Sequence, residues 1–230
     1  YALGEIILVV IGILIALQIN NWNETRKTRA TEVLFLENIK ADLELNLVAI
    51  DSFIKSRKKA IASSNIILDI FENRRPLNLN EFNLHSLDVM IWFPFQQNDN
   101  TYQELVNSGQ LSIISNKDIK DHLQNIQSNL KTIAFVESEM QQDFESYMYD
   151  EYFTLVDLNA TAKNYFEQTG KGAITTKISE AEVLELLKNR TFKNGFVLSN
   201  FNSNLLLEEY SKMQKSTKNL IALIDTEISN

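Results

Sequence analysis

The sequence contains no cysteine, only two histidines, and only six glycines and two prolines in 230 residues. The absence of cysteine excludes disulfide scaffolds, cysteine-ligated zinc, iron–sulfur clusters and thiol catalysis. Two histidines exclude most histidine-based metal sites and disfavour histidine-dependent catalysis. The scarcity of glycine and proline excludes collagen-like and linker-like chains. It also excludes most β-sandwiches and barrels, which need turn residues at short, regular intervals.

An excess of basic residues is also missing. The 22 Lys and Arg residues are outnumbered by 30 Asp and Glu residues, which gives a net charge of −8. Because binding to phosphate backbones needs a basic face, we expect no nucleic-acid partner. Hydrophobic residues make up 44% and charged residues 23% of the chain, which is typical of a folded protein and excludes wholesale disorder.

The chain opens with a long apolar run. Residues 6–17 read IILVVIGILIAL without one polar side chain, and Leu3 to Ile19 is long enough to cross a bilayer as a helix. Trp22 follows where an interfacial aromatic residue is expected. The alternatives are a secretory signal peptide, although no small-x-small cleavage site follows, and a buried core helix. We predict a transmembrane helix at residues 1–21 and an extramembrane domain at residues 22–230, with the lipid bilayer as a partner.

Small residues form one stripe along this span. Gly4, Leu8, Gly12 and Ala16 recur at steps of four, and Gly12-x-x-x-Ala16 is a small-x-x-x-small pair that lets two helix backbones approach closely. We interpret this stripe as a candidate helix-packing surface in the membrane.

Two blocks of sequence resemble a known family. GEIILVVIGILIALQINNWNE at Gly4–Glu24 and TYQELVNSGQLSIISNKDIKDHL at Thr101–Leu123 are similar to the recurring stretches of a domain-of-unknown-function family of single-pass membrane proteins from Gram-negative bacteria. The resemblance implies an inner-membrane location. It implies no activity, so no functional residue is carried over from the family.

The orientation in the membrane depends on residues that precede Tyr1. The chain does not begin with Met, so we expect further residues there. Arg26, Lys27 and Arg29 follow the span and alone would place the large domain in the cytoplasm. Members of the resembled family carry a short basic segment before the span, and such a segment would place the C-terminal domain in the periplasm. We take the periplasmic orientation as our expectation.

The rest of the chain reads as long amphipathic helices. No Gly or Pro occurs between Ile13 and Arg75, and apolar residues recur there at three-four spacing. Asn46 lies within this stripe, where a polar residue can select a partner helix. Similar spacing predicts helices from Asn116 to about Leu155 and from about Thr191 to Ile228. We predict an all-α fold in which a bundle of three long, antiparallel helices and several short ones follows the span.

Several local features are predicted between the long helices. Asn80 is expected to cap a short helix, and Thr101-x-x-Glu104 and Ser179-x-x-Glu182 read as capping boxes. Residues 159–177 show no firm period and are expected to form a loop. Glu137 interrupts the apolar stripe of its helix, so that face is expected to turn to water.

One segment stands out as a candidate functional surface. Trp92, Phe93 and Phe95 belong to the densest aromatic cluster of the chain. The cluster is interpreted either as a core plug beneath the bundle or as a ligand pocket or partner patch. His85 and His122 each have an aspartate one turn away, but the Glu-x-x-His pattern of di-iron bundles is absent, so we interpret both as structural or exposed.

No catalytic constellation or cofactor motif is present in this sequence, so we predict neither enzymatic activity nor a cofactor. The first functional hypothesis is a membrane-anchored interaction or scaffold protein, acting as a homo-oligomer or as an accessory subunit of an envelope complex. The alternative is a sensor-like periplasmic ligand-binding domain. A large shared surface would favour the first, and a defined pocket holding polar groups would favour the second.

Overall fold

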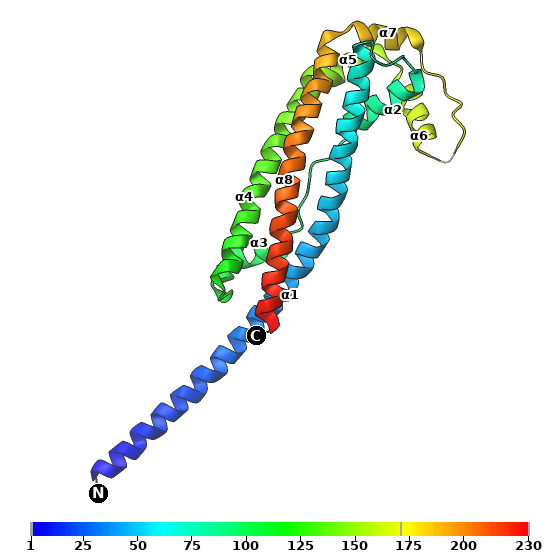
Figure 1. Cartoon of the computed structure of the whole chain (residues 1–230). Coiled ribbons are helices and arrows are strands. Elements are labelled where there is room, and N and C mark those ends of the chain that lie inside the picture. Colours follow the sequence, from blue (N-terminus) through cyan, green and yellow to red (C-terminus); the bar gives the residue numbers. More distant parts are fainter. Residues whose placement is uncertain (1, 171, 230) are drawn as a thin grey trace. The chain divides into compact units, whose positions relative to one another are not determined.

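The computed structural model describes residues 2–170 and 172–229, and these contain helices and connecting segments but no strand (Figure 1). Tyr1, Lys171 and Asn230 lie outside the described residues. The three long helices are α1 (Ala2–Phe71), α4 (Lys117–Phe144) and α8 (Arg190–Ser229). The short helical elements are α2 (Leu79–Met90), α3 (Asn100–Asn107), η1 (Gln110–Ile113), η2 (Glu145–Tyr149), α5 (Asp150–Leu155), α6 (Leu158–Thr169) and α7 (Glu180–Lys188). The predicted all-α class, with three long and several short helices, is confirmed.

The chain divides into two compact units. The first unit takes in the chain up to Asn46, Asn98–Asn125 and the chain from Thr217 onward. The second unit takes in Leu47–Gln97 and Ile126–Ser216. The long helices α1, α4 and α8 each contribute residues to both units.

The second unit is built around parts of the three long helices, which lie side by side in Figure 1. In this unit α8 runs antiparallel to α1, because Asn65 pairs with Asn200 and Glu72, just past the end of α1, pairs with Lys193. By contrast α4 runs in the same direction as α1 (Figure 1). The expectation that all long helices pack antiparallel is therefore wrong for this pair. The long connection over residues 72–116 gives the chain room to return before α4 begins.

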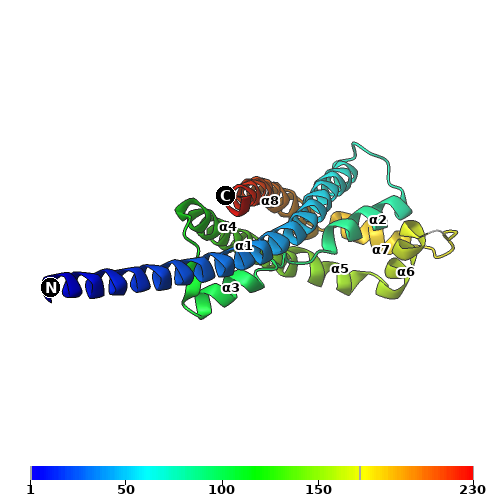
Figure 2. The ribbon, with the colours of Figure 1, turned by 90° about the horizontal axis from the view of Figure 1, so that it is seen from below.

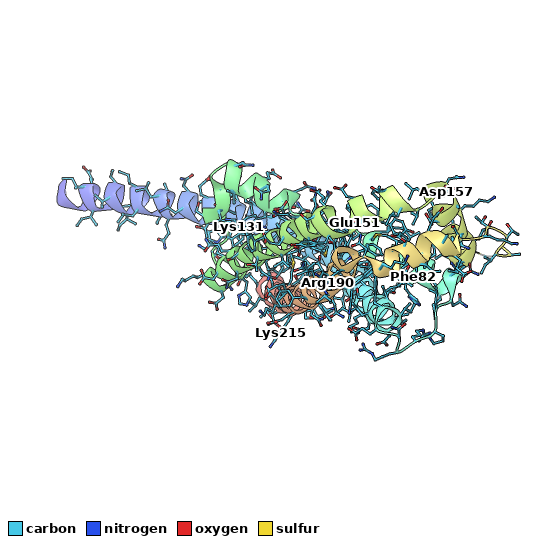
Figure 3. All side chains as sticks on the ribbon, turned by 90° about the horizontal axis from the view of Figure 1, so that it is seen from above. Phe82, Lys131, Glu151, Asp157, Arg190 and Lys215 are labelled. Atoms are coloured by element: carbon cyan, nitrogen blue, oxygen red, sulfur yellow. The ribbon has the colours of Figure 1, made fainter. Side chains whose placement is uncertain are left out.

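Polar contacts help to hold the short helices of the second unit in place. Figure 2 shows α2 beside α6, and between them the Asn83 amide donates to the Thr161 carbonyl and to Asn164 Oδ1, both at 2.9 Å. Phe82, marked on α2 in Figure 3, is buried at 1% exposure. Glu151 lies on α5 and Asp157 at the turn into α6 (Figure 3). The Asp157 side chain caps α6 by accepting from the Asn159 and Ala160 amides.

The first unit places its own apolar seam around the early part of α1. Leu36, Ile39 and Leu43 are buried, as the three-four spacing predicts. Buried polar side chains on α1 also bind the irregular backbone that follows α2 and α3. Glu32 Oε1 accepts from the Ser115 amide at 2.6 Å and from the Ser115 hydroxyl at 2.7 Å.

The N-terminal part of α1 is long and apolar enough to cross a membrane. Its most apolar window has a mean hydropathy of 1.9, and none of that window is buried. The large apolar residues from Ile6 to Ile19 are exposed along with it. This exposure argues against the alternative of a core helix within this chain.

Two of the predicted helix starts are wrong by two residues. Asn78, not Asn80, caps α2, and its side chain accepts from the Glu81 amide at 3.1 Å. Asp99, not Thr101, precedes α3, and the Thr101 amide donates instead to Asp42. In each case another short polar residue lies two positions earlier, and local sequence alone does not choose between them.

Other predicted boundaries are confirmed. Asn116 Oδ1 accepts from the Asp118 amide at 2.9 Å at the start of α4. Ser179 caps α7 through the Glu182 amide. Gly109 adopts φ 71°, the left-handed conformation expected at the end of the short helix that Thr101 belongs to.

The predicted loop over residues 159–177 is wrong for its first part, because Leu158–Thr169 form α6. Polar side chains such as Asn164 hold this helix in place, and it shows no apolar stripe. Apolar periodicity therefore could not predict it. The short π-helix η2 at Glu145–Tyr149 follows α4 and shifts the buried face by one residue. Met148 is therefore buried, whereas Tyr147 is 36% exposed.

Gly195 is required by packing rather than by backbone conformation. A Cβ atom at this position would lie 2.3 Å from Met148 Cγ and 3.3 Å from the Tyr147 carbonyl oxygen. In a helix interior, alanine is normally more stabilising than glycine by about 1 kcal/mol. Here the overlap outweighs that preference, because Cγ lies near the backbone and cannot swing away freely.

We therefore expect Gly195→Ala to lower the free energy of unfolding by about 1–3 kcal/mol, as overpacked cores do. Chemical denaturation measures this change. In a Met148→Ala background the same substitution should be neutral or stabilising, because the overlapping atom is gone. A stabilising effect of Gly195→Ala in the unaltered chain would contradict the packing explanation.

Candidate functional site

The aromatic segment that follows α2 divides between core and surface. Phe95 is 7% exposed, and its ring lies 5.3 Å from Phe53 and 5.9 Å from Tyr210, measured between ring centroids. Phe93 is 73% exposed. Trp92 is half-buried and meets Phe144 edge-on at 6.2 Å. Each of the two interpretations therefore holds for part of the segment, since Phe95 is a core plug while Trp92 and Phe93 border a surface cleft.

Glu137 anchors this segment to the bundle. Its Oε1 atom accepts from the Phe95 amide at 2.9 Å and from the Tyr210 hydroxyl at 2.6 Å. Burial raises the pKa of the Glu137 carboxyl, and the two hydrogen bonds oppose that rise. The expectation that this face turns to water is wrong, because Glu137 is only 5% exposed. The extended segment brings an unpaired amide that needs a buried acceptor.

Arg57 is the second buried charged group at this place. It is 3% exposed, and its Nη1 donates to the Met140 sulfur at 3.3 Å. Burial lowers the pKa of the Arg57 guanidinium, and its electrostatic interactions with Tyr210 and Glu137 oppose that change. Its Nε is buried without a hydrogen-bond partner.

A cleft of about 270 Å³ lies beside Arg57. Its walls come from α1 and from the segment after α2, and the lining residues are Ser52, Phe53, Ser56, Arg57, Ile91, Trp92 and Phe93. The sequence singled out Trp92 and Phe93 correctly as surface candidates. It gave no reason to choose Arg57, because an isolated arginine on an amphipathic helix normally faces water.

The predicted packing stripe of the span is open in the structure. Leu8 is 73% exposed, and Gly12 and Ala16 are exposed as well. A Cβ atom added at Gly4 or Gly12 would meet no other atom within 4 Å. The stripe is therefore accessible to a second helix.

Asn46 uses its side chain within the chain. Its amide nitrogen donates to the Asn98 carbonyl at 2.7 Å, and its oxygen accepts from the Asn98 amide at 2.8 Å. With 2% exposure, Asn46 fixes the backbone after the aromatic segment and is not presented to a partner helix.

A serine, a histidine and an aspartate meet between α1 and α2. The Ser63 hydroxyl lies 2.9 Å from His85 Nδ1 and 3.4 Å from Asp88 Oδ2. Asp88 accepts from Ser63, Lys59 and Tyr165, so it does not orient the imidazole as a catalytic triad requires. Burial lowers the pKa of His85. We interpret this cluster as structural.

The second histidine is tied to its own helix. His122 Nδ1 lies 2.9 Å from the Asp118 carbonyl oxygen. Across the described ranges, no group of three or more His, Asp or Glu side chains is arranged to hold a metal ion.

Residues 5–144 match the model of a family of unknown function (DUF6090). The chain belongs to this family. The matched stretch contains most of the apolar run, Arg57, Glu137 and the aromatic segment, whereas Tyr210 lies beyond it. Searches of curated proteins and of solved structures find no match.

The buried Glu137 carboxyl makes stability depend on pH in a defined direction. Because the folded-state pKa is raised, folding is favoured while the carboxyl is protonated, and that contribution is lost as the pH rises through the raised pKa. We expect Glu137→Gln, whose amide oxygen can accept the same two hydrogen bonds, to gain stability relative to the unaltered chain as the pH rises above about 4.5, the ordinary pKa of a glutamate. Denaturant titrations of both proteins at several pH values measure the difference.

Glu137→Leu provides the matched comparison. It leaves the Phe95 amide and the Tyr210 hydroxyl without an acceptor, which should cost about 2–5 kcal/mol at low pH, where the Glu137 carboxyl of the unaltered chain is protonated, and less as the pH rises. If the difference in the free energy of unfolding between Glu137→Gln and the unaltered chain does not change with pH, Glu137 does not titrate as its burial requires.

Proposed function

We propose that this protein is a membrane-anchored, non-catalytic interaction protein that works as a homo-oligomer or as an accessory subunit of a larger envelope complex. In this proposal the N-terminal part of α1 crosses the inner membrane of a Gram-negative bacterium once. Residues from about Asn23 onward lie in the periplasm. The apolarity and complete exposure of the first part of α1 support a membrane anchor.

The observation that carries the proposal is an apolar stripe on the outer face of α8. Val197, Phe201 and Leu205 recur every four residues and are 48%, 60% and 37% exposed. Large apolar side chains at helical spacing normally face a core, so a row of them in water indicates a surface that another chain covers. The open Gly12 and Ala16 stripe supports a further contact inside the membrane.

A second candidate function is supported by the cleft beside Arg57. A defined pocket that combines aromatic walls with a buried cation is the feature expected of a ligand-binding, sensor-like domain. This candidate is compatible with the first, because the α8 stripe and the cleft share no residue.

We expect Phe201→Ser to reduce cross-linking of the protein in native membranes by about tenfold, a factor equivalent to about 1.4 kcal/mol. Gly12→Ile should also weaken association, by keeping two span helices apart. Cross-linking followed by mass spectrometry identifies whether the partner is a second copy or another protein.

Phe166→Ser is the matched control for the surface variant. Phe166 is 67% exposed, but it lies on α6, away from the stripe in the sequence. Val10→Ile is the corresponding control on the opposite face of the span. A chain that cross-links to nothing, or equal losses in Phe201→Ser and Phe166→Ser, would remove the support for this proposal.

The orientation can be tested with a single introduced cysteine, since the chain has none. Lys117 has a side chain that is 84% exposed, so Lys117→Cys gives an accessible thiol. We expect a membrane-impermeant maleimide to label it in intact spheroplasts, whereas the cysteine-free parent stays unlabelled. Labelling that appears only after lysis would show the opposite orientation.

A further inference from the structure

The guanidinium of Arg57 lacks the partners that a buried cation needs. Arginine is seldom fully buried unless a carboxylate pairs with it, because removing a charge from water is costly. Arg57 makes no ion pair with any described residue, and its one hydrogen bond is to the Met140 sulfur, a weak acceptor. The Nε proton therefore has no acceptor among the residues that the structure describes.

Glu137 does not fill this role. Its charge interacts with Arg57, but its Oε1 atom already accepts from both the Phe95 amide and the Tyr210 hydroxyl. Part of the Arg57 charge is thus left without a direct counter-ion at the cleft that Arg57 lines.

The rest of the cleft has the composition of a small-molecule site. Phe53, Trp92 and Phe93 supply aromatic side chains to the lining, and aromatic rings together with a cation favour a flat, anionic ligand. Ser52 and Ser56, one helical turn apart on α1, present exposed hydroxyls that can donate to the same anion. The cleft volume of about 270 Å³ lies just below the usual range for ligand pockets, which limits the ligand to a small one.

We propose that this cleft binds a small organic monoanion, namely a carboxylate attached to a flat apolar body, with the carboxylate on Arg57 and the body against Trp92 and Phe93. The planar guanidinium matches a carboxylate in shape and charge. A phosphate dianion fits less well, because Arg57 is the only cation among the seven lining residues and already interacts with the charge of Glu137. The proposal deepens the second candidate function and does not depend on the first.

Phenylacetate is a suitable probe, and phenylacetamide is its uncharged counterpart of the same shape. The full chain with Trp22→Phe, held in lipid nanodiscs, leaves Trp92 as the only tryptophan. Its fluorescence, together with ligand-observed NMR, reports binding at the cleft. We expect phenylacetate to bind with a Kd on the order of 1 mM or tighter, and phenylacetamide to bind about tenfold more weakly or worse.

Two variants test the role of charge. Arg57→Gln should abolish the preference for the carboxylate, and circular dichroism shows whether it still folds. Ser56→Asp changes an exposed helix residue, so it keeps the fold while placing a negative charge in the cleft, and it should weaken phenylacetate binding about tenfold. Lys58→Gln removes a neighbouring exposed charge that does not line the cleft, and it should change the affinity less than twofold.

Several outcomes would overturn the proposal. These are no phenylacetate binding up to about 10 mM, equal affinity for phenylacetamide, unchanged affinity in Ser56→Asp, or displacement of phenylacetate by a lower concentration of inorganic phosphate. The effect of Phe201→Ser on cross-linking does not depend on whether the cleft binds phenylacetate. The interaction proposal and the ligand proposal can therefore fail independently.

Discussion

The irregular segments of this chain depend on buried carboxylate and amide side chains from the long helices. A backbone amide that crosses a helix bundle outside regular secondary structure must find an acceptor, or its burial is costly. Glu137 accepts from the Phe95 amide and Asn46 from the Asn98 amide, while Asp42 accepts from the Thr101 amide. Glu32 does the same for the Ser115 amide. These helix-borne acceptors fix where the connection between α1 and α4 lies.

The aromatic segment shows how this anchoring creates a surface feature. The hydrogen bond from the Phe95 amide to Glu137 accompanies packing of the Phe95 ring against Phe53 and Tyr210. With Phe95 held in the core, Trp92 and Phe93 remain at the edge of the cleft beside Arg57. Glu137, the acceptor that fixes the segment, also interacts through its charge with Arg57, but its hydrogen bonds come from the Phe95 amide and the Tyr210 hydroxyl. Anchoring the segment and leaving Arg57 without a close counter-ion are two results of one arrangement.

Apolar spacing was sufficient to predict the long helices and their buried faces. Leu206, Tyr210, Met213, Leu220 and Ile224 on α8 are all buried as their three-four spacing predicts. Elements held by polar contacts could not be found in this way. The helix α6 carries no apolar stripe, and its asparagine contacts come from residues about eighty positions earlier in the chain.

The prediction that Glu137 faces water was wrong for a related reason. A single carboxylate in an apolar stripe normally marks a solvated edge, and only the structure shows that an amide 42 residues away lies against it. The candidate surface at Trp92 and Phe93 could be predicted from aromatic density alone. Arg57 could not, because burial of a charged residue is decided by long-range packing that local spacing does not record.

Arg57 differs in kind from the other buried polar groups that lack partners. Among the described residues these are otherwise hydroxyls of Ser64, Ser86, Ser199, Ser203 and Thr217 and side-chain amide oxygens of Gln97 and Asn129. A serine or threonine hydroxyl in a helix can still turn toward its own backbone carbonyl one turn earlier, so leaving it unpaired costs little. A guanidinium has no such local alternative, and its charge cannot be removed by deprotonation. Burying the Arg57 charge without an ion-pair partner therefore destabilises the folded chain at this cleft. Packing of the aromatic core must offset that destabilisation. Proteins tend to break the rules of polar burial at functional sites, and this is why the cleft at Arg57, rather than the serine–histidine–aspartate cluster, is the best candidate for binding chemistry in the second unit.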